Sequence, residues 1–340
     1  MKIQKFNRYK QNTPLCKFCI ERGGSIYPID PSGINKKTNP GFMNPAIMVY
    51  NNNLIGILRT TNYILNVAEQ HKYTHSYGPL LYVHRENDVT LRTWNYFLEF
   101  NEDYSIKSCI EIDTSYFDKP PKWTMIGLED ARLVHWDNKL FVTGVRRDTT
   151  DTGVGRMQLS ELQVNNSTVK EVSRVRIPAP GADNTYCEKN WMPFEDKPYT
   201  FLKWSSPTEI VEFNNEKTKV VSNSGKNHYT GKKDLRGGSQ LIKWGKGHLA
   251  ITHTVDLTKN YLMRKNGIYL HQFAYYEDST LKKVTKDFSF LAGRTEFCVG
   301  MCKFKEKVII TFSYHDNLAF LLETSEETIT EFMRENGHST

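Results

Sequence analysis

Short apolar strands separated by tight polar turns run through most of this chain. Five segments follow one plan: a polar or small residue, an apolar strand, a polar turn, a second apolar strand and a closing polar residue. Apolar runs of strand length bounded by turn residues predict β-hairpins. The five predicted hairpins span residues 44–59, 129–146, 190–203, 238–253 and 299–315.

Further strand-like stretches lie between these hairpins, at residues 94–100, 157–164, 209–213 and 268–276. Helical periodicity is confined to the tail, where Thr328, Ile329 and Phe332 are spaced about one turn apart. A repeated hairpin with outer strands is typical of a propeller blade. We therefore predict an all-β fold, a five-bladed β-propeller with a short C-terminal helix. A β-sandwich of two stacked sheets is the alternative.

This pattern divides the chain into three parts. Residues 1–41, rich in Lys, Asn and Pro, are predicted to form an N-terminal arm or lid. Residues 42–324 are predicted to form the catalytic propeller, and residues 325–340 the helical tail. Radial blades bring the ends of their inner strands to a shared central channel. Polar residues at those strand ends are therefore expected to converge.

The segment from Ile126 to Arg132 carries the most informative of these polar residues. Glu129, Asp130 and Arg132 lie next to an apolar strand. Burying ionised groups is unfavourable unless they are paired, so such groups beside an apolar strand indicate a polar pocket rather than a core. Neighbouring residues of a strand point to opposite faces. Glu129 and Asp130 can therefore share one ligand only if the strand begins at a bulge or turn.

Other strand-end residues are candidates for ligand binding. Arg147 and Arg156 could converge on an anion, because guanidinium groups match phosphate oxygens in a bidentate way; pairing with carboxylates is the structural alternative. Trp191 beside Asn190 suits stacking on a sugar and binding its hydroxyls, although a Trp in the core is equally common. Histidines at matching repeat positions could contact phosphate or carry a proton. The remaining candidates are Arg59, His253 and His315.

Composition narrows the classes of protein. The 340 residues are 39% hydrophobic, carry a formal net charge of +7, and include no apolar run long enough to span a membrane. Met1–Arg8 lacks the apolar stretch of a signal peptide. These features predict a soluble, cytoplasmic protein without a membrane partner. The modest positive charge permits an anionic substrate, and Lys226–Lys233 keeps nucleic acid open as a partner.

Six cysteines in such a chain do not predict a disulfide framework. The pairs Cys16/Cys19 and Cys298/Cys302 could bind a metal only if they met in space, and neither has a histidine at finger spacing. Free buried thiols are the favoured interpretation. We expect no metal and no cofactor.

The motif Gly127-Leu128-Glu129-Asp130-Ala131-Arg132-Leu133 resembles the Gly-x-Glu-Asp-Pro-Arg-Ile signature of glycoside hydrolase family 130. This family contains five-bladed propeller β-mannoside phosphorylases and hydrolases, and related propeller glycosyltransferases share its features. The resemblance covers residues 44–316 in architecture, and only this motif is specific. Ala131 replaces the usual proline, and the later motifs differ from those of the phosphorylases.

The resemblance implies inverting glycosyl transfer. Asp130 would be the general acid, acting by relay through a sugar hydroxyl. Glu129 and Arg132 would hold the sugar or orient the acid. Phosphate would be held by Arg147, Arg156 and His253.

The motif differences favour a glycosyltransferase that uses a nucleotide- or phosphate-linked donor and a sugar acceptor. A β-mannoside phosphorylase or glycoside hydrolase is the first alternative. A non-catalytic glycan-binding propeller and an enzyme that adds sugar to nucleic acid are the others.

Overall fold

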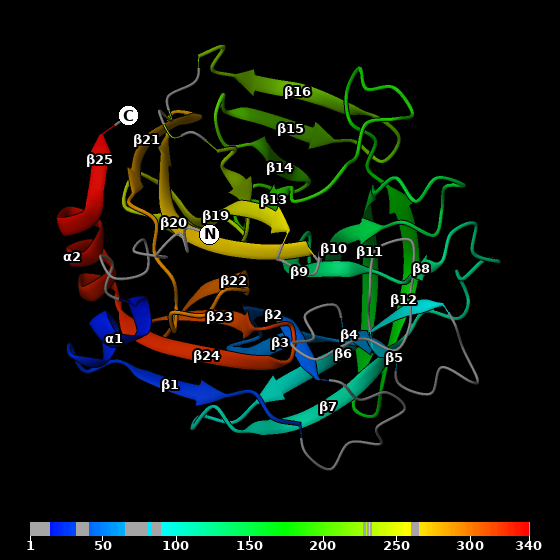
Figure 1. Cartoon of the computed structure of the whole chain (residues 1–340). Coiled ribbons are helices and arrows are strands. Elements are labelled where there is room, and N and C mark those ends of the chain that lie inside the picture. The colour runs from blue at the N-terminus through cyan, green and yellow to red at the C-terminus, as the bar shows by residue number, and fades with distance from the viewer. Residues whose placement is uncertain are drawn as a thin grey trace, which may run out of the picture.

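The computed structural model describes residues 14–31, 41–64, 81–82, 90–226, 229, 231, 233–259 and 265–339. These residues form an all-β structure with two helices (Figure 1). Most strands belong to five antiparallel units, each built from strands that follow one another along the chain. The units are numbered 1 to 5 in chain order.

The strands of each unit are as follows. Unit 1 contains β2 (Phe42–Tyr50), β3 (Asn53–Thr61), β6 (Leu91–Phe100) and β7 (Ile106–Asp113). Unit 2 contains β9 (Glu129–Trp136), β10 (Lys139–Arg146), β11 (Arg156–Asn165) and β12 (Thr168–Arg176). Unit 3 contains β13 (Met192–Pro193), β14 (Thr200–Trp204), β15 (Glu209–Phe213) and β16 (Thr218–Asn223). Unit 4 contains β17 (Arg236–Gly237), β18 (Ile242–Trp244), β19 (Gly247–Lys259), β20 (Lys265–Glu277) and β21 (Thr280–Thr285).

Unit 5 joins the two ends of the chain. Its strands are β22 (Glu296–Phe304), β23 (Lys307–Tyr314), β24 (Leu318–Ser325) and, on the outside, the N-terminal β1 (Ser25–Pro28). Shorter strands complete the pairing: β4 (Tyr63–Ile64) with β5 (Leu81–Tyr82), β8 (Met125–Ile126) with β6, and β25 (Gly337–Ser339) with β21.

The five units pack side by side around a common centre (Figure 1). The strand β2 contacts β22 on one side and β9 on the other, β9 contacts β13, β14 contacts β17, and β18 returns to β22. These contacts close a ring. Units 1 and 2 are also linked by a short parallel pairing of β7 with β12. All five predicted hairpins and the predicted outer strands are present in the structure.

The N-terminal residues do not form a separate arm where the structure describes them. The strand β1 pairs with β24, and α1 (Leu15–Ile20) packs in an apolar cluster that units 4 and 5 share with the C-terminal helix. Phe18 of α1 meets Phe332 of α2 (Glu326–Asn336), with ring centroids 5.0 Å apart. The predicted boundary at residue 41 therefore cuts through a sheet, because apolar burial ties these residues to the C-terminal strands. Residues 1–13 and 32–40 lie outside the described residues.

The predicted C-terminal helix is confirmed as α2. Ser325 caps its N-terminus, since its hydroxyl accepts a hydrogen bond from the Thr328 backbone N–H at 3.0 Å. Thr328, Ile329 and Phe332 are buried, as their spacing predicts. None of the helices in the described part of the chain is long and apolar enough to cross a membrane.

A shared backbone feature marks the beginning of three units. Asn44, Asp130 and Asn190 each have a positive φ, of 48°, 53° and 61°. Asn and Asp adopt this left-handed conformation more readily than other side-chain-bearing residues. The β2–β3 and β9–β10 registers shift beside Asn44 and Asp130. The bulges interrupt strand alternation, which satisfies the condition under which Glu129 and Asp130 can face one ligand.

The six cysteines are all free thiols. Cys16, Cys19 and Cys298 lie within one apolar cluster with residues of α1, β22 and α2. Burial raises the pKa of the Cys19 thiol to about 11. Among the described residues, no group of three or more His, Cys, Asp or Glu side chains is placed to hold a metal ion.

Candidate active site

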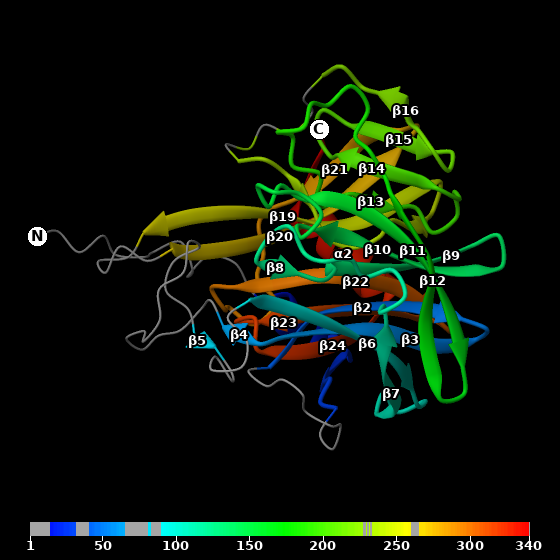
Figure 2. The same cartoon turned by 90° about the vertical axis from the view of Figure 1, so that its right-hand side faces the viewer.

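A polar cavity lies where residues of all five units meet. Its volume is about 170 Å³. Figure 2 shows the β19–β20 hairpin projecting from the body of the molecule, and residues at the base of that hairpin contribute to the cavity wall. The lining residues are Asn44, Arg59, Glu129, Asp130, Val145, Arg147, Lys189, Asn190, Arg236, His253, Val255, Tyr269, Thr295, Phe297 and Asp316.

Asp130 is held through one of its two carboxylate oxygens. Asn44 Nδ2 donates to Oδ1 at 2.7 Å, and Arg59 Nη1 donates to the same atom at 3.0 Å. Among the described residues, no hydrogen bond reaches Oδ2. The side chain remains 21% exposed, so a ligand can approach it. Oδ1 is thereby fixed as an acceptor, and Oδ2 is the oxygen that is available to exchange a proton with a ligand.

Glu129 connects two arginines of the cavity. Its Oε2 accepts a hydrogen bond from Arg147 Nε at 3.4 Å, and its Oε1 lies 3.9 Å from Arg59 Nη2. Arg147 is fixed further by a bond from Nη1 to the Gly153 carbonyl at 3.0 Å. Glu129 therefore balances the charge of both guanidinium groups and limits their movement.

Besides Arg59, three cationic side chains line the wall of the cavity. Arg147 follows β10, Lys189 precedes β13, and Arg236 begins β17. Among the described residues, Lys189 and Arg236 form no ion pair. Cations that converge without their own carboxylates favour the binding of an anion. Lys189 and Arg236 were not among the sequence candidates, although both belong to polar strand ends of the kind that predicted the others.

His253 is buried beside these cations. Burial lowers the pKa of its imidazole well below the usual range, and the nearby His271, Arg236 and Arg132 lower it further. Its ring stacks on Tyr269 at a centroid distance of 5.9 Å and meets Phe297 edge-on at 4.8 Å. His253 is therefore neutral at pH 7. It can contribute a hydrogen bond to a bound anion but no charge.

Arg132 lies beneath the cavity and not in its wall. The side chain is 1% exposed, and its Nε donates to the Gly238 carbonyl at 2.6 Å while Nη1 donates to the Asp130 carbonyl at 2.8 Å. Burial lowers the pKa of this guanidinium to about 10. Arg132 supports the Asp130 backbone and links unit 2 to unit 4, rather than contacting a ligand directly.

Three other sequence candidates lie away from the cavity wall. Trp191 has 0% exposure and packs against Phe201 in the core, so its indole is inaccessible to a sugar. Arg156 points elsewhere, with Nη1 and Nη2 each 2.7 Å from the backbone carbonyls of Tyr186 and Asn184. His315 is half-buried and stacks on Tyr314 at 4.4 Å, next to Asp316, which does line the cavity.

These candidates lie away from the cavity because neighbouring residues of a strand point to opposite faces, and the sequence does not show which face meets the cavity. Trp191 directly follows Asn190, whose left-handed backbone turns its neighbour into the core. Arg156 begins β11 opposite Arg146 in register, and neither lines this cavity. Tyr269 and Asp316 were missed because an isolated Tyr in a strand and an Asp in a turn give no pattern that distinguishes them from ordinary surface residues.

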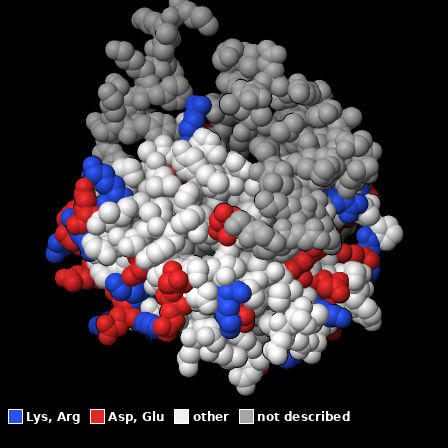
Figure 3. All heavy atoms as spheres, turned by 90° about the horizontal axis from the view of Figure 1, so that it is seen from below, with Lys and Arg blue, Asp and Glu red and all other residues white. Residues whose placement is uncertain are grey.

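On one face of the molecule, the described residues form no continuous basic surface that would favour nucleic acid as a partner. On the face shown in Figure 3, the described Lys and Arg side chains alternate with Asp and Glu in small groups. Sequence-independent binding to nucleic acid uses a continuous basic surface. Of the predicted basic stretch Lys226–Lys233, residues 227, 228, 230 and 232 lie outside the described residues.

Comparisons with known proteins agree with the fold. No family model matches the sequence, and no curated protein matches it either. The β-1,2-mannobiose phosphorylase from Listeria innocua superposes with a TM-score of 0.55 at 12% identity, over 92% of this chain and 100% of that one. A second structure comes from work on the GH130 family of mannoside phosphorylases, which contains glycoside hydrolases that target β-1,2 mannosidic linkages. It superposes with a TM-score of 0.56 at 12% identity, over 89% of this chain and 94% of that one.

A third structure is MPT-4, a mannose phosphorylase from Leishmania mexicana in complex with phosphate ion. It gives a TM-score of 0.50 at 9% identity, over 93% of each chain. The resemblance to glycoside hydrolase family 130 is thus confirmed at the level of the fold. The phosphorylase and hydrolase alternative is closer to these findings than the predicted glycosyltransferase, which they do not support.

Proposed function

We propose that this protein is a carbohydrate-active enzyme that cleaves a β-mannoside with inorganic phosphate. The observation that carries this proposal is the cavity in which the Asp130 carboxyl group faces the same space as Arg147, Lys189 and Arg236. A proton-transfer group and an anion site in one small cavity are the two elements that phosphorolysis requires.

Phosphorolysis in this cavity would use the following residues. A phosphate oxygen, held by Arg147, Lys189 and Arg236, forms a bond to the anomeric carbon of the sugar. The bond between that carbon and the glycosidic oxygen breaks, and this oxygen takes up a proton that Asp130 supplies from Oδ2, directly or through a sugar hydroxyl. The products are a sugar 1-phosphate and the free acceptor sugar. Asn190 and Asp316, which also line the cavity, would hold sugar hydroxyls.

The electrostatics of the cavity fit an anionic co-substrate. A neutral His253 can form a hydrogen bond with the bound anion, and it adds no charge to the cavity. Glu129 compensates the buried charge of Arg59 and part of that of Arg147. Lys189 and Arg236 then remain for the phosphate. The volume of about 170 Å³ is below the about 300–1,000 Å³ of drug-sized sites, which suits a phosphate and a single sugar unit.

The architecture that supports this site is, we propose, a five-bladed propeller in which each unit is one blade. The closed ring of contacts between neighbouring units and the position of the cavity at their common centre support this assignment. The strand β1, paired outside β24, would close the ring by joining the N-terminal segment to the last blade.

The proposal is tested with β-1,2-mannobiose in the presence and absence of phosphate. We expect sugar 1-phosphate only when phosphate is present, and a loss of about 10²–10⁴-fold in kcat for Asp130→Asn, the range of general acid catalysis. Asn keeps the left-handed backbone that Asp130 requires. Asp137→Asn, in the turn at the other end of β9 with a φ of 50°, is the matched control.

Three outcomes would contradict the proposal. Release of mannose without phosphate would make the protein a hydrolase. Equal activity of Asp130→Asn and wild type would remove Asp130 from the mechanism. If all sugar substrates are unreacted but bind to the folded protein, the cavity serves recognition without catalysis.

A further inference from the structure

A second cavity lies on the other side of the chain from the candidate active site. Its volume is about 390 Å³, and strands β10, β11 and β12 and the loop at residues 117–122 surround it. The two cavities share no lining residue. The chain at Arg146 and Arg147 separates them, since Arg147 lines the candidate active site and Arg146 lines the second cavity.

The lining of the second cavity is strongly cationic. Asp148 is the one carboxylate among its described lining residues. The cationic side chains are Lys119, Lys122, Arg146, Arg156, Arg174 and Arg176.

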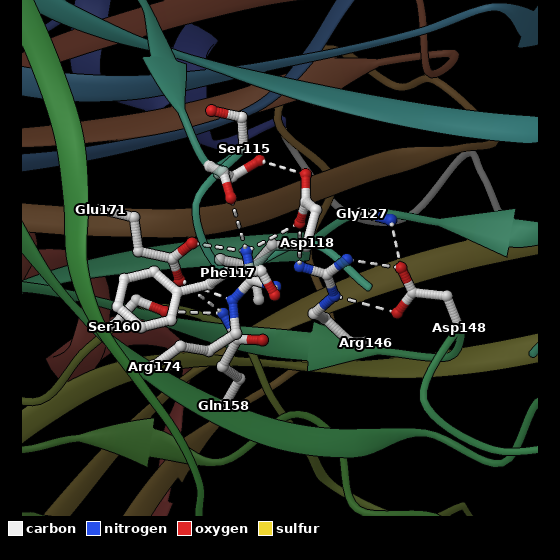
Figure 4. Close-up of polar contacts among 12 residues, drawn as sticks. Ser115, Phe117, Asp118, Gly127, Arg146, Asp148, Gln158, Ser160, Glu171 and Arg174 are labelled. Carbon is white, nitrogen blue, oxygen red and sulfur yellow. Dashed lines mark hydrogen bonds and ion pairs between the residues drawn. The ribbon is translucent and has the colours of Figure 1, made fainter. Parts of the chain in front are cut away.

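Carboxylates in the cavity wall and around it pair with three of these arginines. Figure 4 shows Arg146 between Asp148 and Asp118, with Nε 2.9 Å from Asp148 Oδ1. Arg174 contacts Glu171 and Asp118 in the same view. Arg176 pairs with Glu188. These pairs hold the wall of the cavity in place.

Arg156 differs from these three. Its side chain is buried, with 6% exposure for the residue, and its guanidinium bonds only to the backbone carbonyls of Gly155, Tyr186 and Asn184. Among the described residues, no carboxylate lies within 4.0 Å of it, and Lys119 forms no ion pair either. A buried cation without a counter-ion is unfavourable. An anion in the cavity would supply that counter-ion.

The rest of the lining is apolar. Phe117, Pro120, Met157 and Val175 contribute carbon surface, and the volume of about 390 Å³ falls within the range of about 300–1,000 Å³ of small-molecule sites. We propose that this cavity binds a small organic anion. A phosphate or carboxylate group lies between Arg156 and Lys119, and the carbon skeleton packs against Phe117 and Met157.

The site is coupled by structure to the candidate active site. Asp148, which closes one side of the cavity, accepts a hydrogen bond from the Gly127 backbone N–H at 3.2 Å (Figure 4). Gly127 precedes Glu129 and Asp130 by two and three positions and has a φ of 100°. A ligand that contacts Asp148 therefore meets a side chain that is hydrogen-bonded to the segment carrying the candidate acid. The binding site itself does not depend on the proposed function.

Isothermal titration of the full chain tests the proposal with mannose 6-phosphate and glucuronate as the two charged probes. Methyl mannoside is the uncharged control. We expect saturable binding of a charged probe, weakened about tenfold or more in Arg156→Met and in Lys119→Met, since each removes one charged contact. Arg147→Met, which alters the candidate active site, leaves this binding unchanged. The probe that binds more tightly identifies the anionic group.

Three results would overturn the site. They are the absence of saturable binding by both charged probes, unchanged affinity in Lys119→Met, and loss of binding in Arg147→Met alone. Lys119 is exposed, so its replacement leaves folding intact even if Arg156→Met destabilises the protein. A fourth contrary result is binding of methyl mannoside that Lys119→Met weakens as much as it weakens binding of the charged probe, because the charge would then not be recognised in this cavity.

Discussion

Asn44 and Asp130 lie 86 positions apart in the chain, yet the Asn44 amide donates a 2.7 Å hydrogen bond to Asp130 Oδ1. Both residues lie near the start of the first strand of their unit and have a left-handed backbone. Ser313 donates to Asn44 Oδ1 at 2.8 Å, which orients the amide so that its NH₂ faces the carboxylate. Three units thus meet at the candidate acid.

Replacement of Asn44 by Gly tests this relationship. Gly accepts the positive φ, so the substitution removes the amide and keeps the backbone. We expect kcat for phosphate-dependent cleavage to fall about 10–100-fold, because a hydrogen bond to a charged group is worth about 1.5–3 kcal/mol. Asn51→Gly, in the exposed β2–β3 turn with a φ of 49°, is the control. Equal effects of the two variants would contradict a role for Asn44 at the site.

Replacement of Arg236 by Met tests the anion site. Arg236 lines the candidate active site and forms no ion pair among the described residues. We expect KM for phosphate to rise about tenfold or more, since a charged hydrogen bond is lost, while KM for the sugar is unchanged. Steady-state kinetics with each substrate varied in turn separate the two. Arg334→Met, with a side chain 75% exposed on α2, should change neither constant, and a larger effect on the sugar would place Arg236 elsewhere.

Replacement of Trp191 tests its position in the core. We expect Trp191→Phe to lower the midpoint of thermal unfolding while KM for the sugar stays the same. Trp191→Ala should cost about 3–5 kcal/mol of stability through the cavity that it leaves. Trp204→Phe, at a residue 39% exposed, should change neither quantity. A rise in KM for Trp191→Phe without loss of stability would instead support stacking on a sugar.

The burial of the His271 imidazole predicts how the free energy of unfolding depends on pH. The residue has 0% exposure, packs against Phe288 and Phe290, and neither ring nitrogen has a hydrogen-bond partner in the described structure. Burial lowers its pKa to about 3. The unfolded state therefore binds a proton that the folded state does not bind between about pH 6.5 and pH 3, and stability decreases as the pH falls through this window.

From these values, His271 should contribute about 2 kcal/mol of the stability lost between pH 7 and pH 5. His271→Leu, which cannot be protonated, should lose about that much less over the same interval. Denaturant unfolding at the two pH values measures the difference. His135→Gln, at a half-buried position on β9, is the control, and an identical pH dependence of His271→Leu and wild type would contradict the assignment.

Much of the fold could be predicted from the sequence. Each hairpin is local, because its two strands and its turn are adjacent in the chain, and apolar runs with polar turns report it directly. The tail helix is local for the same reason. The motif at Gly127–Leu133 identified Glu129 and Asp130, and repeat positions brought Arg59, Arg147, Asn190 and His253 to the same cavity.

The tertiary structure decided which side chains face that cavity. Alternation along a strand shows which residues share a face, but it does not show whether that face meets the core, the cavity or solvent. The bulges beside Asn44 and Asp130 also change the register. Arg156 and Trp191 were predicted to bind ligand and lie elsewhere, whereas Lys189 and Arg236 take their place in the wall. Pairing of β1 with β24 likewise depends on contacts between the two ends of the chain. Such long-range contacts follow from burial in the folded chain, which local patterns do not encode.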